Sequence, residues 1–241
     1  AALAMSIISA PDTRDVYGWI SPAPDFNEGL EDGVRGLRVA YSPKLGFARR
    51  VHPEIESAVA AAARTFESLG ATVEEAEPDI GEDPIGTWNT FWWPSMLFQL
   101  QAFGDRARDL SDPALLAAAD KSEAVPVFEH LRAQLHRAHL HNVTAKFHET
   151  YDLLLTPSLP LPAFEVGDLV PRSGDWGTAW SDWAPFSYPF NLTTQPAASV
   201  PCGLTKAGLP MGLQIIGAIG ADALVLRASR AFEAAMPFPT L

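Results

Sequence analysis

The sequence has 241 residues, of which 47% are hydrophobic and 19% are charged. This composition is typical of a globular protein long enough to bury one large core, and it excludes a disordered or fibrous chain. The formal net charge of −12 excludes nucleic acid as an expected partner, because a phosphate backbone would be repelled.

The first element is apolar. Residues 1–9 lack the basic start of a signal peptide, and we interpret them as the end of a core helix entered part-way along. A native N-terminus after removal of Met is the alternative. Residues 12–36 are rich in Pro, Gly and Asp and predict a long surface connection.

A strand–helix–strand unit follows. Residues 37–41 form a short apolar run that suits a strand. Within 55–69, apolar residues recur at steps of 4, 3, 4 and 3, which predicts a helix. Gly70 stands where a left-handed helix cap belongs, and 72–74 begins the next strand. A βαβ unit of this length predicts parallel pairing with a right-handed crossover.

The rest of the chain alternates in the same way. The remaining predicted elements are, in chain order, a helix at 84–103, a helix at 127–149, a buried strand at 153–155, an ordered loop at 158–185, paired strands at 197–200 and 212–216 joined by a Gly-Leu-Pro turn, and a helix at 222–235 capped by Asp222. Helices mixed with apolar strands predict the α/β class. No apolar run approaches the ~18 residues that span a bilayer, so we expect no membrane partner.

Motifs of several known catalytic sites are missing from the sequence. It has no Gly-x-Ser-x-Gly, Ser-x-x-Lys or Gly-x-Gly, and neither two glycines nor two serines are adjacent. The chain therefore lacks a Gly/Ser-rich turn of the kind that bares a hydroxyl nucleophile beside free backbone N–H donors.

Cysteine and histidine give no stronger site. Cys202 is the only cysteine, which fits a cytoplasmic location; it follows an apolar strand, so we expect a core residue rather than a nucleophile. Five of the six histidines lie within 130–148, but a helix separates those on one face by roughly 10–16 Å, too far to share a metal ion. His136 and His139 could still chelate weakly, although a solvated helix face is the simpler interpretation. We expect no metal and no cofactor.

The most informative segment is 185–217. The positions in it that carry a resemblance to a known family are Asn191, Pro196, Val200, Pro201, Gly203, the Gly208-Leu209-Pro210 turn, Gly212 and Gln214. Supporting positions lie at 36–39, 51–54, 151–157 and 223–233. In order and spacing these residues resemble the C-terminal half of the amidase-signature family, nearly end to end.

The resemblance implies a fold and a reaction. The expected fold is the C-terminal portion of the amidase-signature domain, a mixed β-sheet with helices on both faces, in a single region spanning 1–241. The family hydrolyses amides with a serine nucleophile, a bridging serine with a cis peptide, and a lysine base. Those residues belong to the family's N-terminal half, and none can be carried onto this sequence. We therefore assign no catalytic residue and expect 1–241 to be truncated and inactive alone.

What the resemblance implies for this half is a pocket wall. Family members line the substrate pocket partly with C-terminal residues, and Trp side chains can form an apolar wall for an aryl or alkyl amide. The residues favoured for substrate binding are Trp92, Trp180, Trp183, Phe186 and Asn191. Ordinary core packing is an equally good interpretation of Trp183 and a better one of Trp88.

Two alternatives stay open. The glutamine-dependent tRNA amidotransferase subunit of the same family resembles this chain but places an Asp shortly before the Asn191 position. Here that position falls on Trp183 or Ala184, with Asp182 out of register, so a stand-alone amidase is favoured. The other alternative is a non-catalytic interaction fragment. The expected partners are a small amide, the missing half in cis or in trans, and a second copy of the chain.

Overall fold

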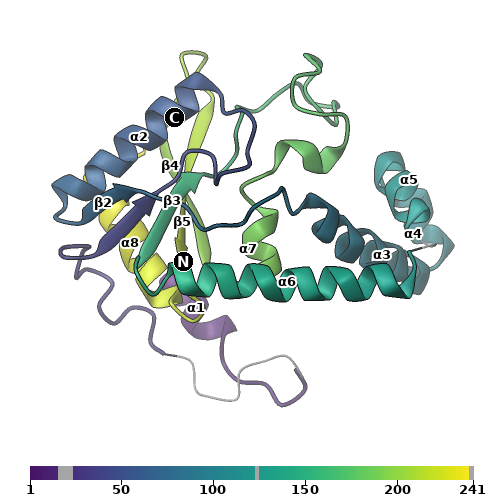
Figure 1. Ribbon diagram of the computed structural model, residues 1–241, viewed down its shortest axis with the longest axis horizontal. Coiled ribbons are helices and arrows are strands. Elements are labelled where there is room, and N and C mark those ends of the chain that lie inside the picture. Colours follow the sequence, from purple (N-terminus) through teal and green to yellow (C-terminus); the bar gives the residue numbers. More distant parts are fainter. Residues whose placement is uncertain (16–23, 123–124, 239–241) are drawn as a thin grey trace.

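The computed structural model describes residues 1–15, 24–122 and 125–238, so part of the predicted connection at 12–36 lies outside the described residues. Its centre is one five-stranded sheet with the order β2-β1-β3-β5-β4 (Figure 1). The strands are β1 (Arg38–Tyr41), β2 (Thr72–Glu75), β3 (Leu153–Pro157), β4 (Ala197–Leu204) and β5 (Pro210–Gly217). The sheet is mixed, which confirms the predicted α/β class.

The predicted βαβ unit is present. β1 pairs in parallel with β2, and α2 (Pro53–Ser68) connects them. Gly70 adopts φ +95° just after the helix, the left-handed conformation that glycine enters at low cost. β1 also pairs in parallel with β3, whose five residues are all buried.

The C-terminal strands form a hairpin. β4 and β5 are antiparallel, and β5 is antiparallel to β3. The ladder between β4 and β5 shifts register between Pro201 and Gly203, where the chain has a β-bulge or similar irregularity. β4 has no neighbour on its other side among the described residues.

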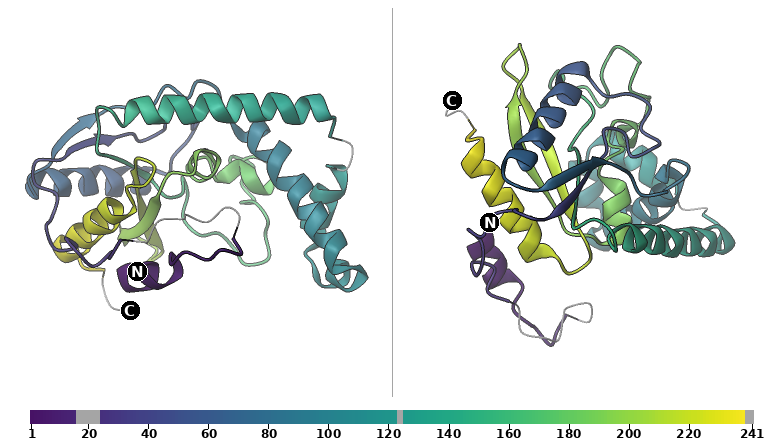
Figure 2. Two further views of the ribbon diagram at one scale, coloured as in Figure 1. Left: turned by 90° about the horizontal axis from the view of Figure 1, so that it is seen from below. Right: turned by 60° about the vertical axis from the view of Figure 1, so that its left-hand side comes forward.

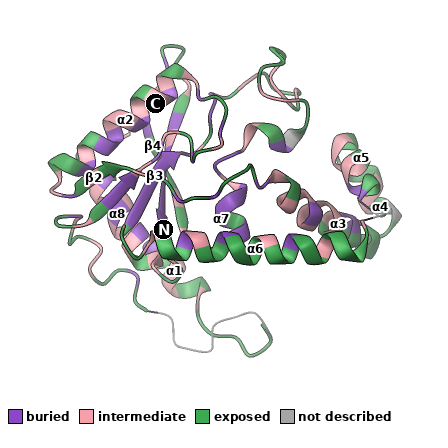
Figure 3. Cartoon of the chain, in the orientation of Figure 1, coloured by how far each residue is buried: buried purple, intermediate pink, exposed green. Residues whose placement is uncertain are grey.

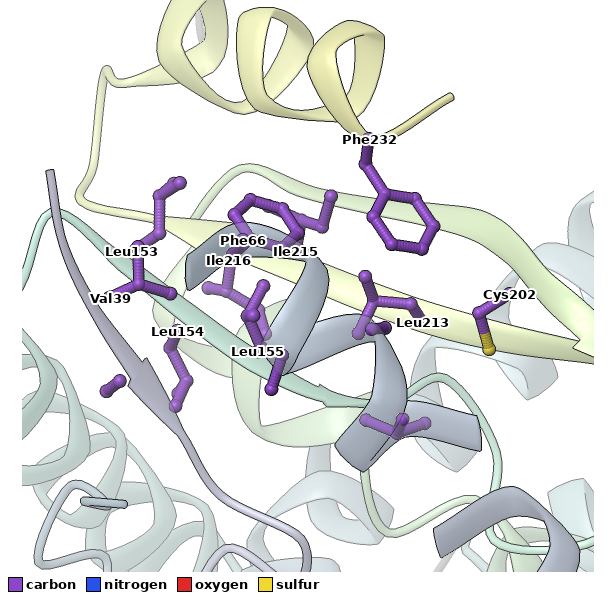
Figure 4. Close-up of a cluster of buried hydrophobic side chains, with 14 of the residues drawn as sticks. Val39, Phe66, Leu153, Leu154, Leu155, Cys202, Leu213, Ile215, Ile216 and Phe232 are labelled. Carbon is purple, nitrogen blue, oxygen red and sulfur yellow. The ribbon is translucent and has the colours of Figure 1, made fainter. Parts of the chain in front are cut away.

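One face of the sheet is covered by α2 and α8 (Asp222–Ala235). A Cβ placed on Gly217 would lie 2.9 Å from Val225 Cγ2 of α8. Side chains alternate along a strand, so Leu213 and Ile215 point to the same face, where Figure 4 shows them packed with Phe66 and Phe232. The N-cap of α8 is Ala221, with no side-chain cap bond. The prediction of Asp222 as the cap was therefore wrong by one residue.

The other face carries α7 (Tyr188–Thr193). Gln214 Nε2 donates a hydrogen bond to the Phe186 carbonyl at 2.9 Å, which ties the start of this segment to β5. Outside α7 lie α3 (Ile85–Phe103) and the long α6 (Val127–Phe147) (Figures 1 and 2). The Tyr188 hydroxyl donates a hydrogen bond to Asp83 Oδ1 at 2.6 Å. Burial is the largest cause that raises the pKa of Tyr188 far above its usual range, and this hydrogen bond is the next. Helices thus cover both faces, as the resemblance implied.

Four helices differ from the sequence predictions: one was predicted only in part, and three were not predicted. The apolar start forms α1 (Ala2–Ile8), beside α8. α4 (Asp105–Leu110), α5 (Pro113–Lys121) and α7 were not expected. α4 and α5 extend away from the sheet beyond α3 (Figures 1 and 2), and Figure 3 shows mostly exposed or half-buried residues there and along α6.

Candidate substrate-binding site

A long loop after β3 carries two of the five predicted site residues, Trp180 and Trp183. It ends in the 3-10 turn η1 (Trp180–Trp183). Trp183 Nε1 donates to the Leu169 carbonyl at 3.1 Å, and its ring meets Phe164 edge-on with centroids 5.6 Å apart. These contacts fold the loop back on itself and hold Trp183 in place.

A cavity of about 510 Å³ opens beside this loop, at the carboxyl end of β3. Its described lining residues are Ile55, Ser158, Leu159, Leu161, Pro162, Ala163, Phe164, Trp183, Ser199, Pro201, Pro210, Met211 and Gly212. We call it the Trp183 cavity. Its wall is apolar and aromatic apart from two hydroxyls, which suits an uncharged organic group.

The two hydroxyls form a pair. Ser158 Oγ and Ser199 Oγ are 2.7 Å apart, across the end of β3 and the middle of β4. Gly212 lies beneath them: a Cβ there would come within 2.8 Å of Ser158 Oγ and 3.1 Å of Ser199 Oγ. Glycine at 212 is therefore required by the close approach of this pair. The pair itself was not expected, although the predicted pairing of 197–200 with 212–216 already placed Ser199 next to this region.

A second cavity, of about 920 Å³, lies on the other side of η1. Its described lining residues are Gly86, Asn89, Thr90, Trp92, Trp93, Asp112, Ala114, Leu115, Ala117, Ala118, Lys121, Ser122, Val125, Glu129, Leu169, Thr178, Ala179 and Ser181. We call it the Trp92 cavity. It lies between α3, α5 and the loop, and it combines indole rings with charged groups.

The five favoured residues are thus not gathered in one place. Trp92 and Trp183 line different cavities. Phe186 has no exposed surface and packs in the main core, whereas Asn191 is exposed on α7. The side chain of Trp180 lies outside the described part of the structure.

Among the described residues, no hydrogen bond joins a serine hydroxyl to a lysine, and no lysine or histidine lines the Trp183 cavity. The thiol of Cys202 is not activated as a nucleophile either. Cys202 is buried in the core, and burial raises the pKa of its thiol to about 11. A thiol attacks as the thiolate, so this position behaves as a core residue.

The raised pKa of Cys202 predicts a pH effect on stability. The folded state favours the neutral thiol, so this contribution is complete below the unfolded pKa and is lost as pH rises through about 11. We expect the free energy of unfolding to fall between pH 9 and 11, and to fall less in Cys202→Ala. Urea titrations of both proteins at several pH values measure the difference. If the free energy of unfolding changed equally with pH in both proteins, the assignment of this effect to the Cys202 thiol would be contradicted.

The histidines of α6 serve other contacts. His136 Nδ1 lies 2.6 Å from Thr87 Oγ1, and its ring stacks on His139 at a centroid distance of 6.4 Å. Within the described ranges, no group of three or more His, Cys, Asp or Glu side chains could hold a metal ion. No helix in the described part of the chain is long and apolar enough to cross a membrane.

Comparison with known proteins identifies the fold. A family model described as Amidase matches residues 108–226. The structure superposes on a bacterial aryl acylamidase of the amidase-signature enzymes with a TM-score of 0.87 at 30% identity, covering 99% of this chain and 51% of that one. The chain belongs to the amidase-signature family. The predicted family and fold are therefore confirmed.

Two relatives show how much of a matching protein's length this chain spans. An acylamidase of Rhodococcus erythropolis is 32% identical over 98% of this chain and 50% of its own length. A glutamyl-tRNA(Gln) amidotransferase subunit of Myxococcus xanthus is 32% identical over 97% of this chain and 52% of its own. The chain spans about half the length of the curated relatives it matches.

Proposed function

We propose that residues 1–241 form one α/β region that supplies the scaffold and a substrate-binding wall of an amidase hydrolysing carboxylic amide C–N bonds. The nucleophilic serine, the bridging serine and the lysine base that the family resemblance implies would come from polypeptide outside this region. One observation carries the proposal: a preformed apolar cavity with a hydroxyl pair and, among its described lining residues, no group able to act as a base. Such a cavity can bind an amide but lacks the means to activate a nucleophile.

The Trp183 cavity favours an aryl or branched alkyl group. Trp183 and Phe164 present ring faces and edges to a space of about 510 Å³, and aromatic walls bind apolar groups mainly through area removed from water. Similarity to an acylamidase and to an aryl acylamidase supports the same choice. Trp92 would act from the second cavity, and buried Phe186 would support the segment between them.

The family's tRNA amidotransferase subunit is the second candidate, because one such protein is as similar in sequence as the acylamidase. A free glutamine substrate carries an ammonium group that needs a charged partner. In that subunit an Asp is expected at the position that Trp183 or Ala184 occupies here, and the carboxylate nearest to it in sequence is Asp182. The Asp182 carboxylate accepts hydrogen bonds from the backbone N–H groups of Thr178 and Ala179, each at 2.9 Å. Because this carboxylate is already committed to the loop, the stand-alone amidase is the better-supported proposal.

A chimeric enzyme tests the proposal. Joining this chain to the half of the Rhodococcus acylamidase that it does not span should give hydrolysis of an aryl acylamide, and hydrolysis of glutamine should be far slower. Trp183→Ala should raise KM for the aryl amide by about tenfold with little change in kcat, since it removes apolar contact common to ground and transition states. Phe103→Ala, an exposed aromatic residue outside both cavities, is the control. An unchanged KM in Trp183→Ala would remove Trp183 from the site, and glutamine as the better substrate would favour the second candidate.

A further inference from the structure

A hydrogen bond joins α7 to the start of α3, across 105 positions of the chain. The hydroxyl of Tyr188, the first residue of α7, donates to Asp83 Oδ1 at 2.6 Å. The same oxygen accepts from the backbone N–H of Ile85, where α3 begins, at 3.0 Å. Tyr188 is only 3% exposed, and because its pKa lies far above the usual range, its hydroxyl stays a donor. The bond therefore fixes the start of α3 relative to the buried side of α7.

A stack of aromatic rings continues this connection into the second cavity. The Trp88 ring stacks on Tyr188 at a centroid distance of 6.4 Å and on Trp92 at 4.8 Å. Stacked rings hold a preferred geometry, so the position of the Trp92 ring depends on that of Tyr188. The first half of α3 lines the Trp92 cavity with five residues: Gly86, Asn89, Thr90, Trp92 and Trp93.

This half of α3 is only loosely coupled to the rest of its own helix. Pro94 lies inside α3, and a proline in a helix removes the backbone hydrogen bond to the residue four positions earlier, which here is Thr90. The contact between Thr87 Oγ1 and His136 Nδ1, at 2.6 Å, ties this half to α6. On the side of the stacked rings, the connection to the core is through Tyr188.

We propose that Tyr188 and Asp83 are positioning residues for substrate binding, whose hydrogen bond sets, through Trp88, where Trp92 stands in the wall of the Trp92 cavity. Neither residue is among the described residues that line the Trp92 cavity or the Trp183 cavity, so each acts through the rings between. The inference rests on the proposed function, because it takes the Trp92 cavity as a subsite for the amide.

The test measures the binding of acetanilide, a simple aryl amide, to the 241-residue chain by NMR. The indole N–H signals of Trp92 and Trp93 report on one cavity, and that of Trp183 reports on the other. Tyr188→Phe removes only the hydroxyl. We expect the dissociation constant read at Trp92 and Trp93 to rise about fivefold, with the value read at Trp183 unchanged. The circular-dichroism signal from coupling of the stacked Trp88 and Trp92 rings should weaken as well.

Tyr151→Phe is the matched control. The Tyr151 hydroxyl donates to Glu74 Oε2 at 2.9 Å, and neither residue is among the described lining of the two cavities. This substitution therefore removes the same kind of tyrosine–carboxylate bond at a distance from the proposed subsite. It should change neither the binding of acetanilide nor the ring-coupling signal.

Variants of the exposed Asp83 test the same bond from the other partner and do not require Tyr188→Phe to fold. Asp83→Asn keeps an oxygen that can accept from the Tyr188 hydroxyl and from Ile85 N–H, so it should bind acetanilide nearly as the wild type does. Asp83→Ala should weaken binding as much as Tyr188→Phe. Since the two residues act as one pair, the double variant should bind no more weakly than either single variant.

Four results would each overturn the inference. The first is wild-type affinity in Tyr188→Phe or Asp83→Ala. The second is an equal loss of affinity at the Trp183 signal or in Tyr151→Phe, which would indicate a general loss of structure. The third is a double variant whose loss is the product of the two single losses. The fourth is a wild-type chain in which acetanilide shifts neither the Trp92 nor the Trp93 signal.

Activity separates this inference from the proposed function. In the chimeric enzyme, Tyr188→Phe should raise KM for the aryl amide with little change in kcat. An active chimera whose KM is unchanged by Tyr188→Phe would overturn the positioning role and leave the amidase proposal standing. Weaker acetanilide binding in Tyr188→Phe, together with a wild-type chimera that hydrolyses no amide, would support the positioning role and contradict the amidase proposal.

Discussion

Residues 1–241 by themselves are expected to hydrolyse aryl and aliphatic amides no faster than buffer does. A hydroxyl attacks an amide only when a base within hydrogen-bond reach takes its proton. The Ser158–Ser199 pair has no lysine or histidine among the described residues around it, and Cys202 is a buried neutral thiol. Relative to an assembled amidase, the loss should be on the order of 10⁶-fold or more.

The measurement is release of an aryl amine at high protein concentration over hours, with Ser158→Ala, Ser199→Ala and Cys202→Ala as matched variants. Contaminating hydrolase would give turnover that none of the three substitutions changes. Turnover lost in one of them would mean that the chain carries its own nucleophile, and the source of the catalytic residues in our proposal would be wrong.

The sequence predicted the sheet well because its strands and helices carry local signals. The apolar steps from Ile55 onward and glycine at 70 define α2 and its end, and both are present. The run at 153–155 is apolar on both faces because helices cover both sides of β3. These features depend on neighbours in the chain, so a single sequence reveals them.

The elements that were missed are short or depend on distant contacts. α7 has six residues with a proline near its start, and its position depends on the bond from Gln214 to the Phe186 carbonyl, 28 residues away in the chain. α5 did carry a local signal: the carboxylate of Asp112 accepts from Ala114 N–H, with Pro113 at the first helical position. That cap and proline pattern typically begins a helix.

The candidate site was predicted by residue type and could not be predicted as a geometry. Tryptophans at 92 and 183 were singled out for their chemistry, but η1 and its loop divide them between two cavities. The fold of that loop depends on bonds such as Trp183 Nε1 to the Leu169 carbonyl, for which the sequence has no periodic signal. The role of each residue in binding stays a prediction.

Apolar side chains exposed on α6 are relevant to the alternative that the chain is a non-catalytic interaction fragment. Phe128, Leu131 and Leu135 follow one another at helical spacing on α6 and are 71%, 46% and 74% exposed. Residues at these steps share one helix face, and the buried residues of α6, such as Leu140 and Thr144, lie elsewhere on the helix. A homodimer therefore stays a prediction, to be checked by the mass of the chain in solution as a function of concentration.

Phe232→Ala should strongly destabilise the fold. Phe232 has no exposed surface, and its ring stacks on Phe66 at a centroid distance of 5.7 Å and 14° between planes, joining α8 to α2 over the sheet. Removing a buried Phe costs about 3–5 kcal/mol from lost burial and the cavity left behind. Since a domain is stable by only about 5–15 kcal/mol, the variant should unfold at a much lower urea concentration.

Phe128→Ala, exposed on α6, should change the free energy of unfolding by less than about 0.5 kcal/mol, and Phe232→Leu should lie between the two. A midpoint for Phe232→Ala close to that of Phe128→Ala would mean that α8 does not pack on α2 in solution, and the closed core on that face of the sheet would be wrong.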